Sequence, residues 1–197
     1  MPPAARRGRP PSSDGRETAA RLLDAAATVC AERGFDGATM ARIAAEVGLT
    51  PAAIYNHFES REDLLYAAGV RGLQQMTAAA GGRVGEEAVR AIAAAYLRPE
   101  LRQTRRLLAE LHLAGGRDAR LADLLARWHK AWAGQLAELL PTTDPDPEAT
   151  AKALFLLLLG LCHLDDLPAV DASPDALAER VDRFVDVAFP TRRRRRG

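Results

Sequence analysis

The residues best suited to acid–base chemistry are His163, Asp165 and Asp166, which lie close together in the sequence. An imidazole beside a carboxylate can accept and return a proton. These residues fall at the end of an apolar segment and just before Pro168, where a helix is expected to stop. The sequence contains no nucleophile elbow, phosphate-binding loop or His-Glu-x-x-His motif. We therefore expect that the chain is not an enzyme and needs no cofactor.

The two cysteines, Cys30 and Cys162, lie in separate apolar segments without Cys-x-x-Cys spacing. This arrangement favours neither a disulfide framework nor a zinc site, so we expect no metal and a reducing, cytoplasmic location. The longest apolar run, residues 153–164, is far shorter than the roughly 20 residues that cross a bilayer. The Arg- and Pro-rich N-terminus has no apolar segment typical of a secretory signal. We expect a soluble protein without a membrane partner.

Charge is distributed unevenly, although the formal net charge is only +1. Residues 1–16 contain four arginines and one acidic residue, and residues 192–196 are all arginine. We expect residues 1–15 to form a disordered basic arm and residues 191–197 a basic tail. Within the arm, Arg7 and Arg9 belong to an Arg-Gly-Arg-Pro sequence similar to the core of an AT-hook, which enters a narrow A·T-rich minor groove. A solvated basic tail is an equally good interpretation of these two arginines.

The composition predicts an all-α fold. Hydrophobic residues make up 48% of the chain and aromatic residues only 5%, and much of the apolar content is Ala and Leu, which favour helices. A chain of 197 residues can bury one core, or a small domain docked on a larger one. Apolar periodicity and capping residues predict helices over residues 16–34, 40–47, 51–58, 61–75, 86–98, 100–113, 117–140, 147–164 and 175–189.

The second and third predicted helices are short and closely spaced. Thr39 and Thr50 are natural N-caps, and Pro51 suits a first helical turn. Gly48 lets the chain reverse tightly between the two helices, and apolar residues such as Ile54 can hold them together. Two short helices joined in this way are typical of a DNA-binding helix-turn-helix.

The sequence around these helices resembles the N-terminal domain of TetR-family transcriptional regulators. The resemblance rests on the string LLDAAATVCAERGFDGATMARIAAEVGLTPAAIYNHFESREDLL. It implies an N-terminal three-helix DNA-binding domain over residues 16–60 and a C-terminal helical ligand-binding and dimerisation domain over residues 61–190. It also implies a homodimeric repressor that a small effector releases from its operator. A helical protein-interaction adaptor that binds no operator is the alternative.

The resemblance also implies which residues contact double-stranded DNA. Phosphate contacts are expected from Thr39, Tyr55, His57 and Arg61, and major-groove contacts from Thr50, Pro51, Ala52, Ala53 and Asn56. Arg42 could reach the backbone or a base edge. Two positions depart from the family pattern: Cys30 stands where phenylalanine is usual, and Arg61 where lysine is usual. Packing of Tyr55 against the first helix and a bland surface role for His57 are the simpler alternatives.

The C-terminal half suggests a dimer and a ligand pocket. The segment around residues 154–164 is apolar almost all round, so a partner subunit or the core of a monomer must cover it. Expected interface residues are Leu154, Leu157, Leu158, Leu161, Val181, Phe184 and Val185. Large side chains with polar tips suit a pocket for a small apolar or aromatic effector, and the candidates are Met76, Tyr96, His112, Trp128, His129 and Trp132.

Overall fold

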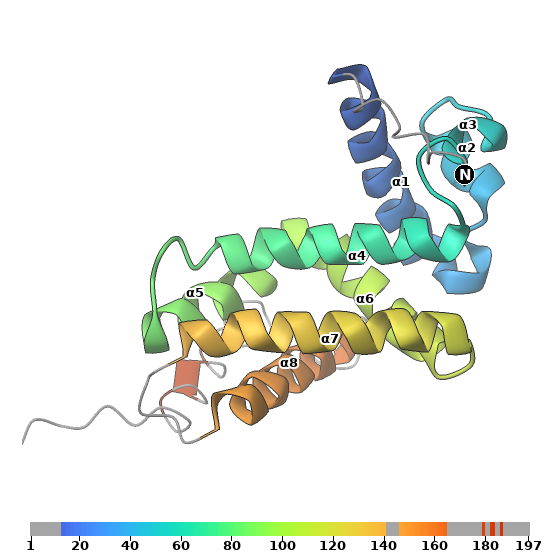
Figure 1. Cartoon of the computed structure of the whole chain (residues 1–197). Helices are drawn as coiled ribbons and strands as arrows, with labels where there is room; N and C mark the ends of the chain where they lie inside the picture. The colour runs from blue at the N-terminus through green and yellow to red at the C-terminus, as the bar shows by residue number, and fades with distance from the viewer. Residues whose placement is uncertain (1–12, 141–145, 165–178, 180–181, 184–185, 187–197) are drawn as a thin grey trace, which may run out of the picture.

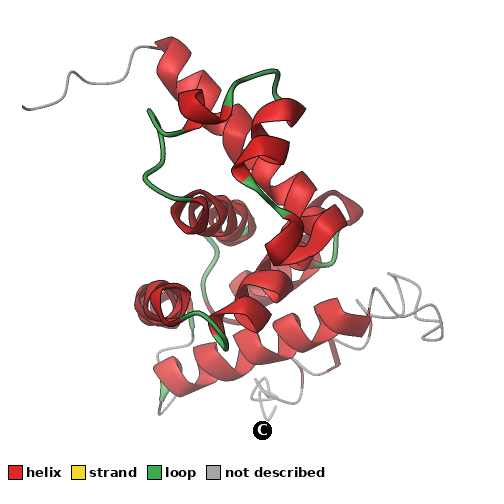
Figure 2. Ribbon diagram, turned by 90° about the vertical axis from the view of Figure 1, so that its right-hand side faces the viewer, coloured by secondary structure: helices red, strands yellow, loops and turns green. Residues whose placement is uncertain are grey.

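The computed structural model describes residues 13–140 and 146–164, together with Glu179, Asp182, Arg183 and Asp186. Every regular element in these residues is a helix, which confirms the predicted all-α fold (Figures 1 and 2). In Figure 1, α1–α3 form a small unit at one end of α4, and α4–α8 form a larger bundle. No described helix combines the length and the apolar character that spanning a membrane requires.

The first helix, α1 (Ser13–Gly37), is broken near its end. Gly34 has a φ of +71°, a conformation that glycine adopts without steric cost, so the last residues of α1 turn away from the main helix axis. The sequence predicted the end of the helix at Gly34. The structure places the break there and adds one further turn, which carries the chain to Thr39.

The next two helices, α2 (Met40–Glu46) and α3 (Pro51–Ile54), begin at the predicted caps. The Thr39 hydroxyl oxygen accepts from the Arg42 N–H at 3.3 Å. The Thr50 hydroxyl oxygen accepts from the Ala53 N–H at the same distance. These bonds satisfy backbone donors that a helix start leaves without a partner. Gly48, with a φ of +71°, makes the turn between the two helices as predicted.

The larger unit follows the predicted order of helices, within a few residues at each end. It contains α4 (Arg61–Ala78), α5 (Gly85–Tyr96), a short 3₁₀ turn η1 (Pro99–Leu101), α6 (Arg102–Gly115), α7 (Ala119–Leu139) and α8 (Pro147–Leu164). Side chains of Ser60, Asp118 and Asp146 accept backbone N–H groups at the starts of α4, α7 and α8. The predicted helix 175–189 lies outside the described residues, except for four positions that are helical.

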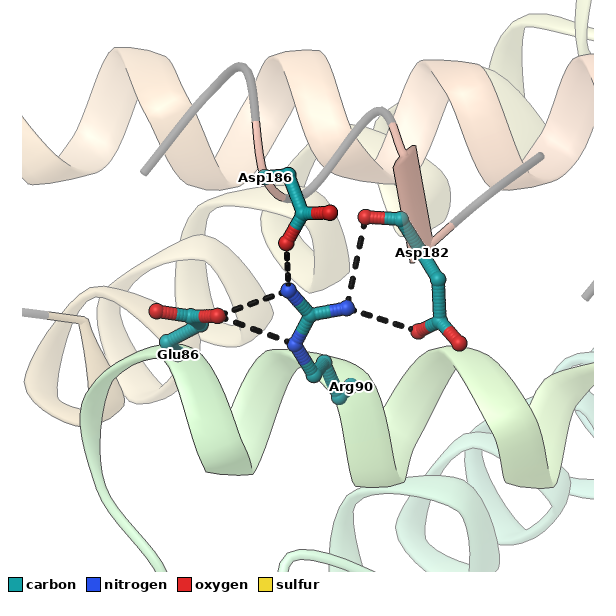
Figure 3. A network of polar contacts seen from close by, with 4 residues as sticks. All are labelled: Glu86, Arg90, Asp182 and Asp186. Carbon is teal, nitrogen blue, oxygen red and sulfur yellow. Dashed lines mark hydrogen bonds and ion pairs between the residues drawn. The ribbon is translucent and has the colours of Figure 1, made fainter. Parts of the chain in front are cut away.

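Arg90 on α5 holds these C-terminal residues against the bundle (Figure 3). Its guanidinium donates to Glu86 one turn earlier at 2.7 Å and to the Asp182 carboxylate at 2.9 Å. It also pairs with the Asp186 carboxylate. Three carboxylates therefore converge on one arginine, and two of them come from a segment nearly a hundred residues away in sequence.

The core is centred on α6, which contacts α1, α4, α7 and α8. Leu107, Leu108 and Leu111 of this helix are at most 1% exposed. A polar contact joins α6 to α1 as well: the Phe35 N–H, next to the break at Gly34, donates to a Glu110 carboxylate oxygen at 2.9 Å. The helices that resemble a DNA-binding domain are thus docked on the larger bundle through α6.

Two glycines let α4 approach α6 closely. A Cβ atom at Gly69 would lie 2.9 Å from a Leu111 methyl carbon, and one at Gly72 would lie 2.2 Å from the Thr104 Cγ2 atom. Both distances are too short for ordinary van der Waals contact, so any larger residue would push the two helices apart.

We predict that Gly72→Ala destabilises the protein by about 1–3 kcal/mol, because it overpacks the contact with Thr104. Urea unfolding measures this change. The matched control is Gly134→Ala on α7, where nothing lies within 4 Å; it should be slightly more stable, because alanine is the better helix former. Adding Thr104→Ser, which removes the clashing methyl group, should recover part of the loss. Equal stabilities for Gly72→Ala and Gly134→Ala would contradict this packing.

Candidate nucleic-acid interface and ligand site

The α3 region presents its polar and small residues on the surface. Ile54 is wholly buried, whereas Thr50, Pro51, Ala52, Asn56 and His57 are exposed and Ala53 is half-buried. Tyr55 is 57% exposed, so it does not pack into the domain core. The simpler alternative for Tyr55, burial against α1, therefore fails. Of the residues expected to contact DNA, those between Thr50 and His57 are therefore mostly exposed, and the buried Ile54 anchors them to the domain core.

Each of the two capping threonines keeps a free hydroxyl hydrogen that can be donated to a bound ligand. Thr39 and Thr50 are exposed, and their hydroxyl oxygens act as acceptors in the caps. A hydroxyl group also carries one donor hydrogen, which remains available to a phosphate oxygen. The caps fix the side-chain rotamers, so both hydroxyl groups are oriented before any ligand arrives.

The two arginines in this region already have partners. Arg42 donates to the Gly37 carbonyl oxygen at 2.8 Å and remains exposed. Arg61 donates to Glu62 at 2.9 Å and to the Phe35 carbonyl oxygen at 3.2 Å, and its guanidinium lies 4.4 Å from the centre of the Phe35 ring. Arg61 thus joins the start of α4 to the end of α1, and the phosphate contact that the resemblance implied for it stays a prediction. Arg7 and Arg9 lie outside the described residues.

Cys30 occupies the centre of the N-terminal unit. Its side chain is completely buried, and burial raises the pKa of the thiol to about 12, with the nearby Glu110 charge adding to the rise. A thiol in this environment stays protonated and unreactive. Cys30 therefore acts as a small core residue where the family pattern has phenylalanine.

A second group of residues forms an aromatic cluster between α6, α7 and α8. Ring centres of Trp132 and Phe155 are 4.8 Å apart, those of His129 and Phe155 are 5.1 Å apart, and those of Trp128 and Phe155 are 5.5 Å apart. His112 stacks on His129 with ring centres 4.9 Å apart. Four of the six residues expected to bind a ligand therefore meet in one place, and Phe155 joins them.

Two pockets adjoin this cluster. One, of about 270 Å³, lies between α4 and α7 and is lined by Trp128 and Trp132 among others. The other, of about 190 Å³, lies between α7 and α8 and is lined by His129, Trp132 and Phe155. Trp132 belongs to both, and only 6% of its surface is exposed.

The other two expected ligand residues belong to the core. Met76 and Tyr96 are each 1% exposed and line neither of these pockets. Leu73, one turn before Met76 on α4, does line the larger pocket, together with Tyr66 and Arg127. Sequence reasoning missed Tyr66, Arg127 and Phe155, because an isolated residue in a helical pattern gives no sign of the pocket that it faces.

The two histidines share a hydrogen bond. The Nε2 atoms of His112 and His129 are 2.8 Å apart, and Nδ1 of His112 is 2.6 Å from the Leu108 carbonyl oxygen. Because that carbonyl can only accept, Nδ1 of His112 carries a proton, and in the neutral pair His129 donates to His112. Burial, and then the charge that His112 can carry, lower the pKa of His129 from 6.5 to about 4.

The leucines that α8 exposes are not the ones expected in the dimer interface. Leu154 and Leu158 are 6% and 7% exposed, so they are buried within their own chain, and Leu157 is half-buried. Leu156, by contrast, is 63% exposed, and Gly160 one turn later is exposed as well. The physical reason is that an apolar helix offers no sequence signal for which side its own bundle covers. The side chains of Leu161, Val181, Phe184 and Val185 lie outside the described residues.

Comparison with known proteins matches the N-terminal unit to one family model. Residues 22–68 match the model described as bacterial regulatory proteins, tetR family. The HTH-type transcriptional regulator UidR of Escherichia coli is 26% identical over 175 residues, which cover 83% of this chain and 88% of that protein. The HTH-type transcriptional repressor KstR2 of Rhodococcus jostii is 41% identical over 61 residues, 28% of this chain and 29% of that protein.

Solved structures share the fold over nearly the whole chain. A putative TetR-family transcriptional regulator from Rhodococcus sp. superimposes with a TM-score of 0.76 at 24% identity, covering 87% of this chain and 98% of that one. A putative transcriptional regulator from Saccharomonospora viridis in complex with choline gives a TM-score of 0.70 at 22% identity, covering 87% and 96% of the two chains.

We predict that His129 makes the fold less stable in acid. The unfolded chain takes up a proton at His129 near pH 6.5, whereas the folded protein does so only near pH 4. Between these values the unfolded state binds more protons, so stability falls as the pH is lowered through this range. His129→Gln should lose part of this dependence, as measured by urea unfolding at about pH 7 and about pH 5. His57→Gln, which changes an exposed histidine, is the control and should keep the wild-type dependence. An unaltered dependence in His129→Gln would refute the prediction.

Proposed function

Since this chain is a DNA-binding transcriptional regulator of the TetR family, we propose that it is a homodimeric repressor that a small molecule releases from its operator. The observation that carries the proposal is the exposed surface of α3, with Tyr55 57% exposed directly after the buried Ile54. An exposed side chain of this size contributes little to the stability of the fold, but it can contact a binding partner. The KstR2 relative is a repressor, which supports repression as the direction of regulation.

The DNA contacts of the helix-turn-helix fall into two kinds, those to phosphates and those to bases in the major groove. We assign phosphate contacts to Thr39, Tyr55 and His57, and major-groove contacts to Asn56 and to the small residues at the start of α3. Because α3 has no arginine, lysine or glutamine, hydrogen bonding to bases depends largely on Asn56 and Thr50. Arg61 joins the start of α4 to the end of α1 and so positions this surface.

A dimer is needed to place two such surfaces on one operator. Successive major grooves on one side of DNA are about 34 Å apart, so a two-fold partner must hold the recognition helices at that spacing. The exposed face of α8 around Leu156 is the candidate contact surface, because large exposed apolar side chains are uncommon elsewhere on the described helices.

The effector would act through α4. This helix begins at the N-terminal unit with Arg61 and lines the larger pocket with Leu73 further along. A ligand that prefers a displaced α4 would shift the dimer away from the spacing that DNA requires, and operator DNA would then weaken ligand binding by the same factor. The Saccharomonospora viridis relative, solved with choline, supports a small-molecule site in proteins of this fold.

A helical adaptor without operator binding is the rival function. An exposed surface on α3 would suit either function, but the family match covers the helix-turn-helix itself and so favours DNA binding. A gel shift with the DNA that flanks the gene of this protein separates the two functions, because an adaptor would leave that DNA unshifted.

We predict that Tyr55→Ala weakens binding to operator and to unrelated DNA alike by about ten-fold, because a phosphate contact carries no sequence information. Asn56→Ala should weaken operator binding more than binding to unrelated DNA. Fluorescence anisotropy with the two DNA duplexes measures both effects. Val84→Ala, which changes a 68% exposed residue before α5, is the control and should bind as the wild type does. Unchanged DNA affinity for Tyr55→Ala would contradict the assignment of this surface.

We predict that Leu156→Glu converts a dimer into a folded monomer. Leu156 is 63% exposed within its own chain, so a charge there spares the monomer core but would be buried without a partner in the interface. Sedimentation measures the mass, and circular dichroism checks that helicity is kept. Leu113→Glu, at a 59% exposed position on α6, should remain a dimer. A monomeric wild type, or a dimeric Leu156→Glu variant, would exclude this interface.

A further inference from the structure

The larger pocket lies between two helices that connect different parts of the molecule. In Figure 1, α4 runs alongside α7. Residues of both helices line the pocket of about 270 Å³. Val70 and Leu73 supply an apolar wall from α4, and Trp128 and Trp132 supply an aromatic wall from α7. A cavity of roughly 150 Å³ is enough to hold a benzene ring, so this pocket has room for one ring and a small polar group.

The charged lining of the pocket is positive. Arg127 is the only charged side chain among the lining residues, and it forms no ion pair with any residue that the structure describes. Its charge acts on Tyr66 across the pocket: burial raises the pKa of Tyr66, and Arg127 opposes that rise. Arg127 is exposed, so solvent screens this charge, but its sign favours a ligand with a negative group over a cation.

One residue that lines the pocket also carries an unsatisfied hydrogen-bond donor. The indole N–H of Trp132 is buried and has no acceptor among the described residues, although the ring lines the pocket and is only 6% exposed. A buried donor without a partner costs about 1–3 kcal/mol. A ligand oxygen that accepts from this N–H, after a small rotation of the indole, would remove that cost. A hydrogen bond formed here would therefore stabilise the complex more than one formed at the exposed surface.

We propose that the effector is a small monocarboxylate with a ring-sized apolar body, bound between α4 and α7. One carboxylate oxygen pairs with Arg127, the Trp132 N–H donates to the ligand, and the ring packs against Trp128 and Leu73. The site itself stands on the pocket, the isolated charge and the buried donor. Its regulatory effect rests on the proposed function, because the ligand must alter the position of α4 to release DNA.

Binding can be followed without a label. The chain contains two tryptophans, and both Trp128 and Trp132 line this pocket, so intrinsic fluorescence reports on it directly. The full-length protein is titrated with sodium benzoate as the anionic probe, benzamide as the neutral probe of the same shape and choline as the cationic probe. We expect saturable binding of benzoate, binding of benzamide that is at least about ten-fold weaker, and no binding of choline.

Three variants test the assigned contacts. Arg127→Gln should weaken benzoate binding about ten-fold and leave benzamide binding unchanged, because only benzoate carries the charge. Lys130→Gln removes the same charge from an exposed position on α7 that lines neither pocket, and should bind benzoate as the wild type does. Trp132→Phe keeps an aromatic ring but loses the N–H, so it should weaken binding of both benzoate and benzamide, with Trp128 still reporting.

The outcomes separate this proposal from the proposed function. Equal binding of benzoate and benzamide, tighter binding of choline, or no saturable binding of benzoate would overturn the proposal, whatever the protein does with DNA. A gel shift made in parallel should show that benzoate weakens operator binding by the wild type, and that Arg127→Gln binds the operator but responds less. Saturable benzoate binding that depends on Arg127, in a protein that binds no DNA, would instead support the site and refute the repressor function.

Discussion

The close contact between α4 and α6 depends on Gly69 and Gly72, because any side chain at these positions would collide with α6. Because Leu111 and Thr104 fill the space where Cβ atoms would stand, α4 cannot move closer to α6. A neighbouring face of α4 lines the pocket toward α7. A ligand that widens this pocket meets a helix that is fixed on one side, so α4 can respond by tilting or sliding along α6 rather than by local adjustment.

The N-terminal helices are positioned to follow such a motion. Arg71 of α4 donates to the Ala20 carbonyl oxygen at 3.0 Å and pairs with Asp24, which ties α1 to α4. Glu110 of α6 accepts from the Phe35 N–H at the broken end of α1. The unit α1–α3 is therefore attached to both helices of the close contact. Sliding of one helix past the other would reorient this unit as a body, which is how a small pocket can influence a distant surface.

The sequence predicted best what local chemistry determines. Thr39 and Thr50 cap helices and Gly48 turns the chain because each acts on its own backbone neighbourhood. It predicted least well what depends on the other helices. Phe155 joins the aromatic cluster, and Leu154 faces the core of its own chain, but both belong to a leucine-rich run that is apolar on every side. Periodicity cannot orient such a helix, so only the packed bundle shows which residues face inward.

The shortness of α3 bears on how proteins of this kind diverge. Of its four residues, only Ile54 is buried, and the exposed positions on either side make almost no contribution to the core. Substitutions there are nearly neutral for stability, because surface changes away from caps and core have small effects on folding. Duplicated genes could therefore acquire new operator preferences by single substitutions at these positions without passing through unfolded intermediates, while the larger helical bundle stays the same.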